Sequence, residues 1–419
     1  MPKELFPKVE GYDSWRDAVA VVENAEIVVG IPSRNVAHTI AYVLKQAAIG
    51  LEKYYGGRKT AIVVCDGLSD DGTVDVVNVM KKNIKIPLTI IPNLRAPGKG
   101  AAMRTIIELI AMNSEADTLV FIDSDLRSIT PEWIPLLAHG AIECGFTAPL
   151  YRRHRFDATI TNFIARPLTA MAYGIDIKQP IGGDFGLNRG LVDVLANNIL
   201  WTSNPWTHLF GVDIFLTHTA LANGVNVCEA LLKAKIHEAK DPSKGLKNMF
   251  VEVTGSLFTM LIEYRDSWTK RRFTELESPP VIDKPEVPDL APWEVRVDPE
   301  NAKKVFHHGL HEYRVVYEKI LGKDLFEKLY SSQVYNEGID TELWSTIVLE
   351  FFKYFVREPA MSKRAIVIET LFPLWQGRLY KYYSEAERLS DKEVEEFLKN
   401  EVKVFVSKRK YFLEEFLPI

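Results

Sequence analysis

Short apolar runs alternate along the first half of the chain with longer segments in which apolar residues recur at helical spacing. The runs predict buried strands at 25–31, 60–65, 88–91 and 119–122. The segments between them predict helices at 38–54 and 74–81, and a third helix that ends near Met112. Strands that alternate with helices are typical of an open, mainly parallel sheet, and such sheets bind ligands at the carboxyl ends of their strands.

The pattern changes in the second half of the chain. Five prolines between positions 278 and 293 predict an extended connector. Beyond it we predict only helices, at 302–320, 323–330, 341–356, 362–380 and 391–416. The segment 343–356 is apolar nearly all round, so it should be buried. We therefore expect an α/β domain at 1–275, a proline-rich connector at 276–298 and an all-α domain at 299–419.

Composition narrows the class of protein. With 419 residues, 47% of them hydrophobic, the chain can fill two cores. A net charge of -5 and a pI of about 6.1 argue against a nucleic-acid partner. The scattered Cys65, Cys144 and Cys228 are interpreted as reduced thiols of a cytoplasmic protein. No signal-peptide pattern and no apolar run of roughly 18 residues is present, so we expect no transmembrane segment, which leaves peripheral membrane contact open.

Two carboxylates follow the fourth predicted strand. Asp123 and Asp125 are two positions apart, so in an extended segment both side chains face the same side. Such a pair of hard oxygen ligands suits Mg²⁺ or Mn²⁺. The Asp-x-Asp pattern by itself is equally typical of a strand that ends in a solvated acidic turn.

Two earlier turns could contact a nucleotide. Gly98-Lys99-Gly100 offers backbone freedom, a cation and a following helix, as a phosphate site does. The spacings of a P-loop and of a dinucleotide-binding turn are both absent, and the alternative is an ordinary strand-to-helix turn with a solvated Lys99. Asp66 could likewise bind a base or ribose, or only cap its own turn.

The ordered combination of these motifs resembles the nucleotide-sugar half of the GT-A glycosyltransferases, over roughly the first 270 residues. This family has a Rossmann-like fold in which paired aspartates hold a divalent cation on the donor diphosphate. The resemblance implies that the donor is bound by Pro32, Asn35, Asp66, Lys99 and Asp123. The acidic residue that often follows the Asn of the first turn is Val36 here, which puts a base contact at that position in doubt.

The middle of the chain resembles one group of this family, the retaining enzymes that make mannosylglycerate, glucosylglycerate or glucosyl-3-phosphoglycerate. The matching residues are Gln179, Gly182, Gly183 and Asp184 for the donor, then Asp213, then His237. The resemblance implies a metal held by Asp125, His237 and Asp123. It assigns Asp213 as nucleophile, base or hydrogen-bond partner, and Lys99 as a stabiliser of the leaving group. A single histidine is otherwise more often structural than a ligand.

The acceptor site is predicted from Arg153, Asp157 and Thr161, which are spaced by four residues. On a helix they would share one face, with an arginine fork for a carboxylate and oxygens for hydroxyl groups. The mannosylglycerate synthase family has the same set at this place in the chain. A surface helix with one ion pair is the alternative. Arg152 and Arg155 add positive charge, so a phosphorylated acceptor stays open.

The sequence thus predicts a metal-dependent, retaining glycosyltransferase that moves mannose or glucose from a GDP-linked sugar to D-glycerate, giving a compatible solute. The rivals are a 3-phosphoglycerate acceptor, an inverting transferase acting on lipid or polysaccharide, and a nucleotide-sugar-binding protein without turnover. The C-terminal helices carry no catalytic motif. We expect them to pack on the catalytic domain, to close one side of its cleft, or to form a homodimer.

Overall fold

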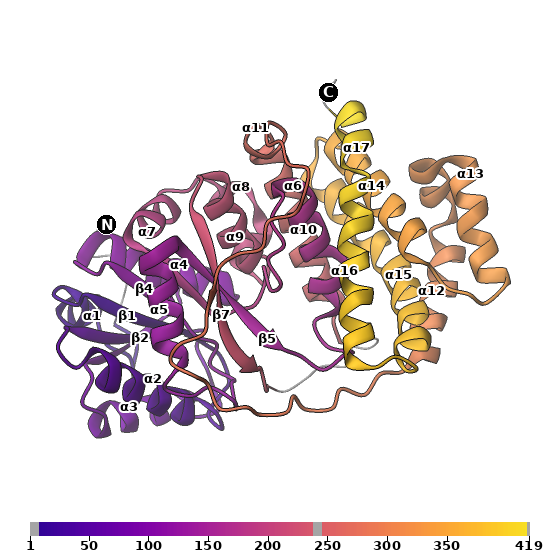
Figure 1. Ribbon diagram of the computed structural model, residues 1–419. Coiled ribbons are helices and arrows are strands. Elements are labelled where there is room, and N and C mark those ends of the chain that lie inside the picture. The colour runs from indigo at the N-terminus through magenta and orange to yellow at the C-terminus, as the bar shows by residue number, and fades with distance from the viewer. Residues whose placement is uncertain (1–7, 238–244, 417–419) are drawn as a thin grey trace. The chain divides into compact units, whose positions relative to one another are not determined.

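The computed structural model of the chain describes residues 8–237 and 245–416 (Figure 1). These residues form two compact units, each built from three separate parts of the chain. The first unit takes the strands, with 1–153, 177–238 and 278–292, and the second takes 154–176, 239–277 and 293–419. This division differs from the three consecutive segments that we expected, because two helical stretches inside the first 277 residues belong with the C-terminal helices.

The first unit is organised on one mainly parallel sheet, as predicted. Its strands are β1 (Ile27–Ser33), β2 (Thr60–Asp66), β3 (Leu88–Pro92), β4 (Thr118–Phe121), β5 (Gly145–Arg152), β6 (Phe185–Asn188), β7 (Asn226–Ala234) and β8 (Val281–Ile282). Their order is β3-β2-β1-β4-β6-β5-β7-β8. β6 runs antiparallel to both of its neighbours, whereas every other pair is parallel. The start of β6 therefore lies at the edge where β4 and β5 end.

Helices cover both faces of this sheet because its strands are apolar on both sides. The helices are α1 (Trp15–Val22), α2 (Ile40–Tyr55), α3 (Thr73–Asn83), α4 (Lys99–Asn113), α5 (Trp133–Cys144), α7 (Arg189–Ala196), α8 (Leu200–Ser203), the 3-10 helix η3 (Pro205–His208) and α9 (Val212–Ala222). Val29 and Ile31 of β1 share a core with α2 and α5. Gly30 between them faces Ile106 of α4 on the other side.

The second unit is helical. It contains the π-helical turn η2 (Thr161–Ala165), α6 (Arg166–Tyr173), α10 (Lys247–Glu263), α11 (Arg265–Trp268), α12 (Pro299–Glu312), α13 (Arg314–Val334), α14 (Thr341–Arg357), α15 (Met361–Ala386), α16 (Asp391–Ser407) and α17 (Arg409–Phe416). The predicted burial of the apolar α14 is confirmed, with Trp344 and Phe351 fully inside. The helix predicted at 302–320 instead breaks at Tyr313, which is the cap of both α12 and α13. None of the helices described has the length and apolar character that a bilayer crossing requires.

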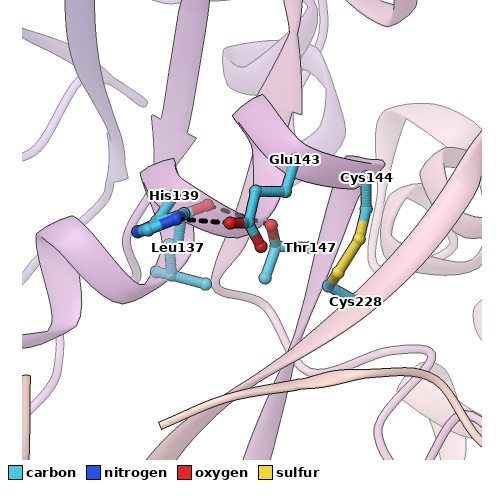
Figure 2. Close-up of a disulfide and its surroundings, with 6 residues drawn as sticks. All are labelled: Leu137, His139, Glu143, Cys144, Thr147 and Cys228. Atoms are coloured by element: carbon cyan, nitrogen blue, oxygen red, sulfur yellow. Dashed lines mark hydrogen bonds and ion pairs between the residues drawn. A yellow bond between two sulfur atoms is a disulfide. The ribbon is translucent and has the colours of Figure 1, made fainter. Parts of the chain in front are cut away.

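The interpretation of the cysteines as three reduced thiols is wrong for two of them. Cys144 ends α5 and Cys228 lies on β7, and the two form a disulfide with their Cα atoms 5.9 Å apart (Figure 2). Cys65 is buried and free. The paired cysteines are 84 residues apart, and only the parallel pairing of β5 with β7 brings them together. The spacing of cysteines along a chain contains no such information.

Candidate functional site

The strand ends bring the predicted donor residues to one edge of the sheet. Phe121, the last residue of β4, pairs with Phe185, the first residue of β6. Asp123 and Asp184 therefore meet just beyond this pair, and the Asp123 backbone N–H donates to Asp184 Oδ1 at 2.7 Å. Their proximity follows from the antiparallel insertion of β6, because Asp184 precedes its strand and Asp123 follows its own.

The neighbouring parallel pair delivers a second group of side chains to the same edge. Arg152 of β5 pairs with Ala234 of β7, so Arg153 and Lys235 leave the sheet side by side. Two residues further, His237 Nε2 lies 3.2 Å from Arg153 Nη2. A predicted acceptor residue and a predicted metal ligand are thus in contact within the first unit.

A chain of ion pairs connects Asp123 to Asp213. Lys99 is the first residue of α4 and Asp213 lies in the first turn of α9. Lys99 Nζ is 2.8 Å from Asp123 Oδ1 and 3.2 Å from Asp213 Oδ1. The Lys99 side chain is only 15% exposed, so the alternative of a solvated lysine is wrong. The structure brings together the two predicted catalytic residues and the first aspartate of the Asp-x-Asp motif.

The glycines beside Lys99 have a packing role. A Cβ on Gly100 would lie 1.8 Å from the Thr207 carbonyl oxygen, and a Cβ on Gly98 would lie 2.3 Å from that of His208. Gly98 also has a φ of 125°, which disfavours other residues. These glycines let the start of α4 approach η3 closely, and this approach places the Lys99 ammonium in the site. Phosphate binding by the turn stays a prediction.

Two site residues were missed by the sequence analysis, Lys235 and Tyr151. Lys235 Nζ is 2.7 Å from Asp123 Oδ2, 2.9 Å from Asp184 Oδ2 and 2.7 Å from the Gly182 carbonyl oxygen. The Tyr151 hydroxyl donates to Asp184 Oδ2. Position was the available signal for both: each lies at the carboxyl end of a strand, and Lys235 is two residues before His237.

Burial and these contacts set the charges of the site. Burial alone would raise the pKa of Asp123, but the ammonium groups of Lys235 and Lys99 together hold it below its usual range. Burial alone would lower the pKa of Lys99, and the carboxylates of Asp123 and Asp213 raise it instead. For Asp184 and Asp213 burial prevails and raises the pKa. The site therefore contains a cluster of two ammonium groups and three carboxyl groups: Lys99, Lys235, Asp123, Asp184 and Asp213.

The three predicted metal ligands are not gathered into one site. No group of three or more His, Cys, Asp or Glu side chains suited to a metal occurs in 8–237 and 245–416. Each of the two Asp123 carboxylate oxygens pairs with a lysine. Asp125 differs, since its carboxylate makes no hydrogen bond or ion pair with any residue of the described ranges. An oxygen of Asp125 and a nitrogen of His237 are donors that fit Mg²⁺ or Mn²⁺.

The residues predicted to bind the base lie at the ends of β1 and β2. The Asp66 carboxylate is fully buried and accepts hydrogen bonds from the hydroxyls of Tyr12, Ser33 and Ser69, and from the Ser69 N–H. It therefore caps its own turn, which was the structural alternative. Asn35 Oδ1 accepts from the Asp70 N–H, and Pro32 lies buried within β1. Base contacts by Pro32, Asn35 and Asp66 stay predictions.

The turn before β6 fits closely around the cluster. Gln179 is buried, and the Thr217 hydroxyl of α9 donates to the Pro180 carbonyl oxygen. Gly183 has a φ of 90°, and a Cβ there would lie 2.2 Å from Asp123 Oδ2. A Cβ on Gly182 would meet the Pro149 ring at 2.2 Å. The two glycines are thus required for this turn to contact Asp123.

The helix that we predicted for the acceptor residues is wrong. Arg153 follows β5 directly, Asp157 lies in a turn, and Thr161 begins η2 after Ala158 with a φ of 54°. A left-handed residue in this position interrupts any helical face. Arg153 belongs to the first unit, whereas Asp157 and Thr161 belong to the second.

The other two arginines of this segment bind groups of the protein itself. Arg152 contacts the Asp289 carboxylate at 3.1 Å and donates to the Leu290 carbonyl oxygen. Within the second unit, Arg155 pairs with Asp391 at 2.5 Å and donates to the carbonyl oxygens of Ala386 and Leu389. The positive charges of Arg152 and Arg155, which had suggested a phosphorylated acceptor, are therefore largely neutralised by carboxylates or hydrogen-bonded to carbonyl oxygens of the protein.

Comparisons with known proteins show the family of the chain. The family model described as "Mannosylglycerate synthase, GT domain" matches residues 20–259. Mannosylglycerate synthase of Rhodothermus marinus is 26% identical over 209 residues, 45% of this chain and 51% of the relative. That of Selaginella moellendorffii is 26% identical over 165 residues, 37% of either chain. The chain thus spans about half the length, or less, of these curated relatives.

Among solved structures, glucosyl-3-phosphoglycerate synthase from Mycobacterium tuberculosis, in complex with Mn²⁺, UDP-glucose and phosphoglyceric acid, is 21% identical with a TM-score of 0.45. That match covers 62% of this chain and 86% of the other. The family model covers more than half of this chain, and the site residues described above lie inside its limits. The protein therefore belongs to the mannosylglycerate synthase family, through its glycosyltransferase domain.

Proposed function

We propose that the protein is a retaining glycosyltransferase that moves a hexose, mannose in first place, from a GDP-linked donor to a hydroxyl group of D-glycerate. The observation that carries the proposal is the buried chain Asp123, Lys99 and Asp213, together with the Asp125 carboxylate, which has no hydrogen-bond or ion-pair partner within residues 8–237 and 245–416. The family match, whose model and curated relatives are mannosylglycerate synthases, favours mannose.

In this reaction the bond between the anomeric carbon and the β-phosphate oxygen breaks, and a bond from the same carbon to the acceptor oxygen forms. Asp125 and His237 would hold a divalent cation, which when bound neutralises charge on the leaving diphosphate. The Lys99 ammonium is held against Asp123, two residues before Asp125, and would add a fixed positive charge as the phosphate departs. The acceptor proton leaves with the phosphate or passes to a carboxylate.

Asp213 is the carboxylate proposed to act at the sugar. It is 8% exposed, lies in the first turn of α9 and is oriented by Lys99. These contacts suit either a nucleophile or a hydrogen-bond partner of the acceptor, and retention is compatible with both. Replacing Asp213 with Asn should lower kcat by on the order of 10² or more if it contacts the reacting atoms.

D-Glycerate is favoured over 3-phosphoglycerate by the arginines. Arg152 and Arg155 engage Asp289 and Asp391, so Arg153 is the one of the three whose described contact is a site residue, His237. One guanidinium matches one carboxylate, as glycerate requires. A phosphate group with about two negative charges would require more than one of the three arginines as a binding partner.

The decisive experiment is product formation by the purified full chain. GDP-mannose, GDP-glucose and UDP-glucose are each offered with D-glycerate or 3-phosphoglycerate, in Mg²⁺ and again in EDTA, and NMR gives the anomeric configuration. We expect a Mg²⁺-dependent glycoside of D-glycerate with the donor's configuration. Turnover with 3-phosphoglycerate alone would overturn the acceptor assignment, and inversion or metal independence would overturn the mechanism.

A further inference from the structure

Lys235 occupies a place that the reaction described so far does not use. Its ammonium group is inside the first unit, with the side chain 6% exposed. All three of its protons are engaged, by Asp123 Oδ2, Asp184 Oδ2 and the carbonyl oxygen of Gly182. An ammonium has three donors, so this side chain is fully satisfied by three fixed acceptors.

These acceptors come from two separate segments of the first unit. Asp123 follows β4 and lies between Lys235 and Lys99, two residues before Asp125. Gly182 and Asp184 belong to the turn that leads into β6. Lys235 therefore joins the end of β4 to this turn, and the Asp123 N–H bond to Asp184 is a second link between them.

The surroundings leave the turn little freedom to settle elsewhere. A Cβ at Gly183 would lie 2.2 Å from Asp123 Oδ2 and 3.1 Å from Lys235 Nζ, so the backbone touches the ion pair itself. Tyr151 donates to Asp184 from the other side, and its ring centroid is 5.1 Å from Lys235 Nζ. The aromatic face gives the ammonium additional stabilisation without another hydrogen bond.

A buried ion pair of this kind is weak evidence for stability, because desolvation offsets most of the Coulomb gain. What it does supply is a fixed geometry. The Asp123 carboxylate would keep a partner in Lys99 without Lys235, and Asp184 would keep Tyr151. What is lost with Lys235 is its own bridge from Asp123 to Asp184 and Gly182, which leaves the Asp123 N–H bond to Asp184 as the remaining link between the end of β4 and the turn.

We propose that Lys235 is a positioning residue that sets the orientation of the donor's hexose, by fixing the Gly182–Asp184 turn relative to Asp123. This inference rests on the proposed function, since it takes the ligand to be a nucleotide sugar. Lys235 acts through Asp184 and the turn, without contact with the reacting atoms. Its effect should therefore depend on the sugar and not on the nucleotide.

The test compares two ligands on the same variants. Calorimetric titration in Mg²⁺ measures the Kd of GDP-mannose and of GDP for the wild type and for Lys235→Met. We expect GDP-mannose to bind at least tenfold more weakly to Lys235→Met, while the Kd of GDP changes less than about threefold. Tyr151→Phe, which keeps Lys235, should weaken GDP-mannose in the same direction by a smaller factor.

Two controls separate this role from general damage. Lys53→Met removes an ammonium that is 55% exposed and forms an ion pair with Glu132, and it should leave both Kd values unchanged. Lys235→Arg keeps the charge and a fork that can bind two carboxylates, so it should recover part of the sugar-dependent affinity. If Lys235→Met melts below the assay temperature, Lys235→Arg and Tyr151→Phe answer the question.

Each outcome is decisive. An equal loss of GDP and GDP-mannose, or no loss of either, would overturn the positioning role while leaving the proposed function intact. A wild type that binds neither ligand but binds another nucleotide sugar would overturn the GDP-linked donor, and an equal loss of that sugar and its free nucleotide in Lys235→Met would then overturn the positioning role. A wild type that binds no nucleotide sugar at all would overturn the proposed function, and the inference with it.

Discussion

In the proposed reaction, acceptor choice depends on Arg153. Its guanidinium lies 5.7 Å from the Tyr151 ring centroid and 3.2 Å from His237 Nε2. Neighbouring Arg152 reaches the Asp289 carboxylate instead. One strand end thus presents two arginines with different tasks.

We expect Arg153→Ala to raise the KM for D-glycerate by at least tenfold, because a charged hydrogen bond to the carboxylate is lost. Initial rates at saturating donor measure this change. Arg152→Ala is the matched control and should leave that KM within about twofold. A similar rise in both variants would mean that the segment binds the acceptor through its overall charge.

His218 gives the stability of the protein a defined response to acid. It lies on α9 with no exposed surface, and burial lowers its pKa to about 3. The unfolded chain, with an ordinary value near 6.5, binds the proton more readily. Its contribution to stability is therefore full above about pH 6.5 and falls as the pH drops toward 3.

Between pH 7 and pH 5 this single residue should cost the wild type about 2 kcal/mol of unfolding free energy. Urea unfolding of the wild type and of His218→Gln at both pH values measures the difference. The variant should start lower in stability at pH 7 and lose about 2 kcal/mol less on acidification. Equal losses in the two proteins would contradict the burial argument.

At the scale of elements, the start of α4 is where close packing and chemistry coincide. Gly100 allows the helix to touch the Thr207 carbonyl oxygen, and Lys99 before it reaches Asp123. A displaced helix end would carry the ammonium away from its partners.

Gly100→Ala should therefore lower both the melting temperature and kcat, since a Cβ 1.8 Å from backbone oxygen forces the elements apart. We expect a cost of about 1 to 3 kcal/mol, as for other overpacked sites. Gly190→Ala on α7 is the control, because its Cβ would meet only Asn188 Oδ1 at an ordinary 3.6 Å. Melting curves and steady-state rates compare the two. If Gly100→Ala changed neither the melting temperature nor kcat, η3 would be able to move and accommodate the added Cβ.

The elements most accurately predicted from sequence were those with a strong local pattern. The apolar runs that became β1 to β4 are buried along their whole length, so composition alone marks them. The prediction of a helix for the acceptor residues was wrong because residues spaced by four also occur where the end of a strand is followed by a turn. The positive φ of Ala158 could not be recognised from the sequence, whereas a glycine at this position would have suggested it.

Within the candidate site, Asp123, Lys99 and Asp213 could be predicted because each stands beside a turn or a family motif. Lys235 could not, since its role depends on β7 lying next to β5 and on β6 running backwards between β4 and β5. Such pairings join parts of the chain that are far apart in sequence. The periodicity of apolar residues and the local composition give information only about residues that are close in sequence.

For the whole molecule, the disulfide joins Cys144 and Cys228 of the first unit and closes a long loop of the chain, which includes residues 154–176 of the second unit. Loop closure of this length stabilises by about 2 to 4 kcal/mol, chiefly by restricting the unfolded chain. Denatured protein should show one reactive thiol, from Cys65, and three after reduction.

Dithiothreitol should lower the melting temperature of the wild type, as thermal scans with and without it would show. The variant Cys144→Ser should melt at the reduced temperature in both conditions. Three reactive thiols in the unreduced chain would contradict the disulfide directly.

The division into two units, each of three chain parts, also constrains how the protein is made. The polypeptide passes from one unit to the other five times, after residues 153, 176, 238, 277 and 292. A growing chain has completed its last sheet segment only at residue 292, when most of the helical unit is still unsynthesised. Neither unit can be cut out or exchanged between relatives as a single piece of gene, so the two are inherited, and must be engineered, as one.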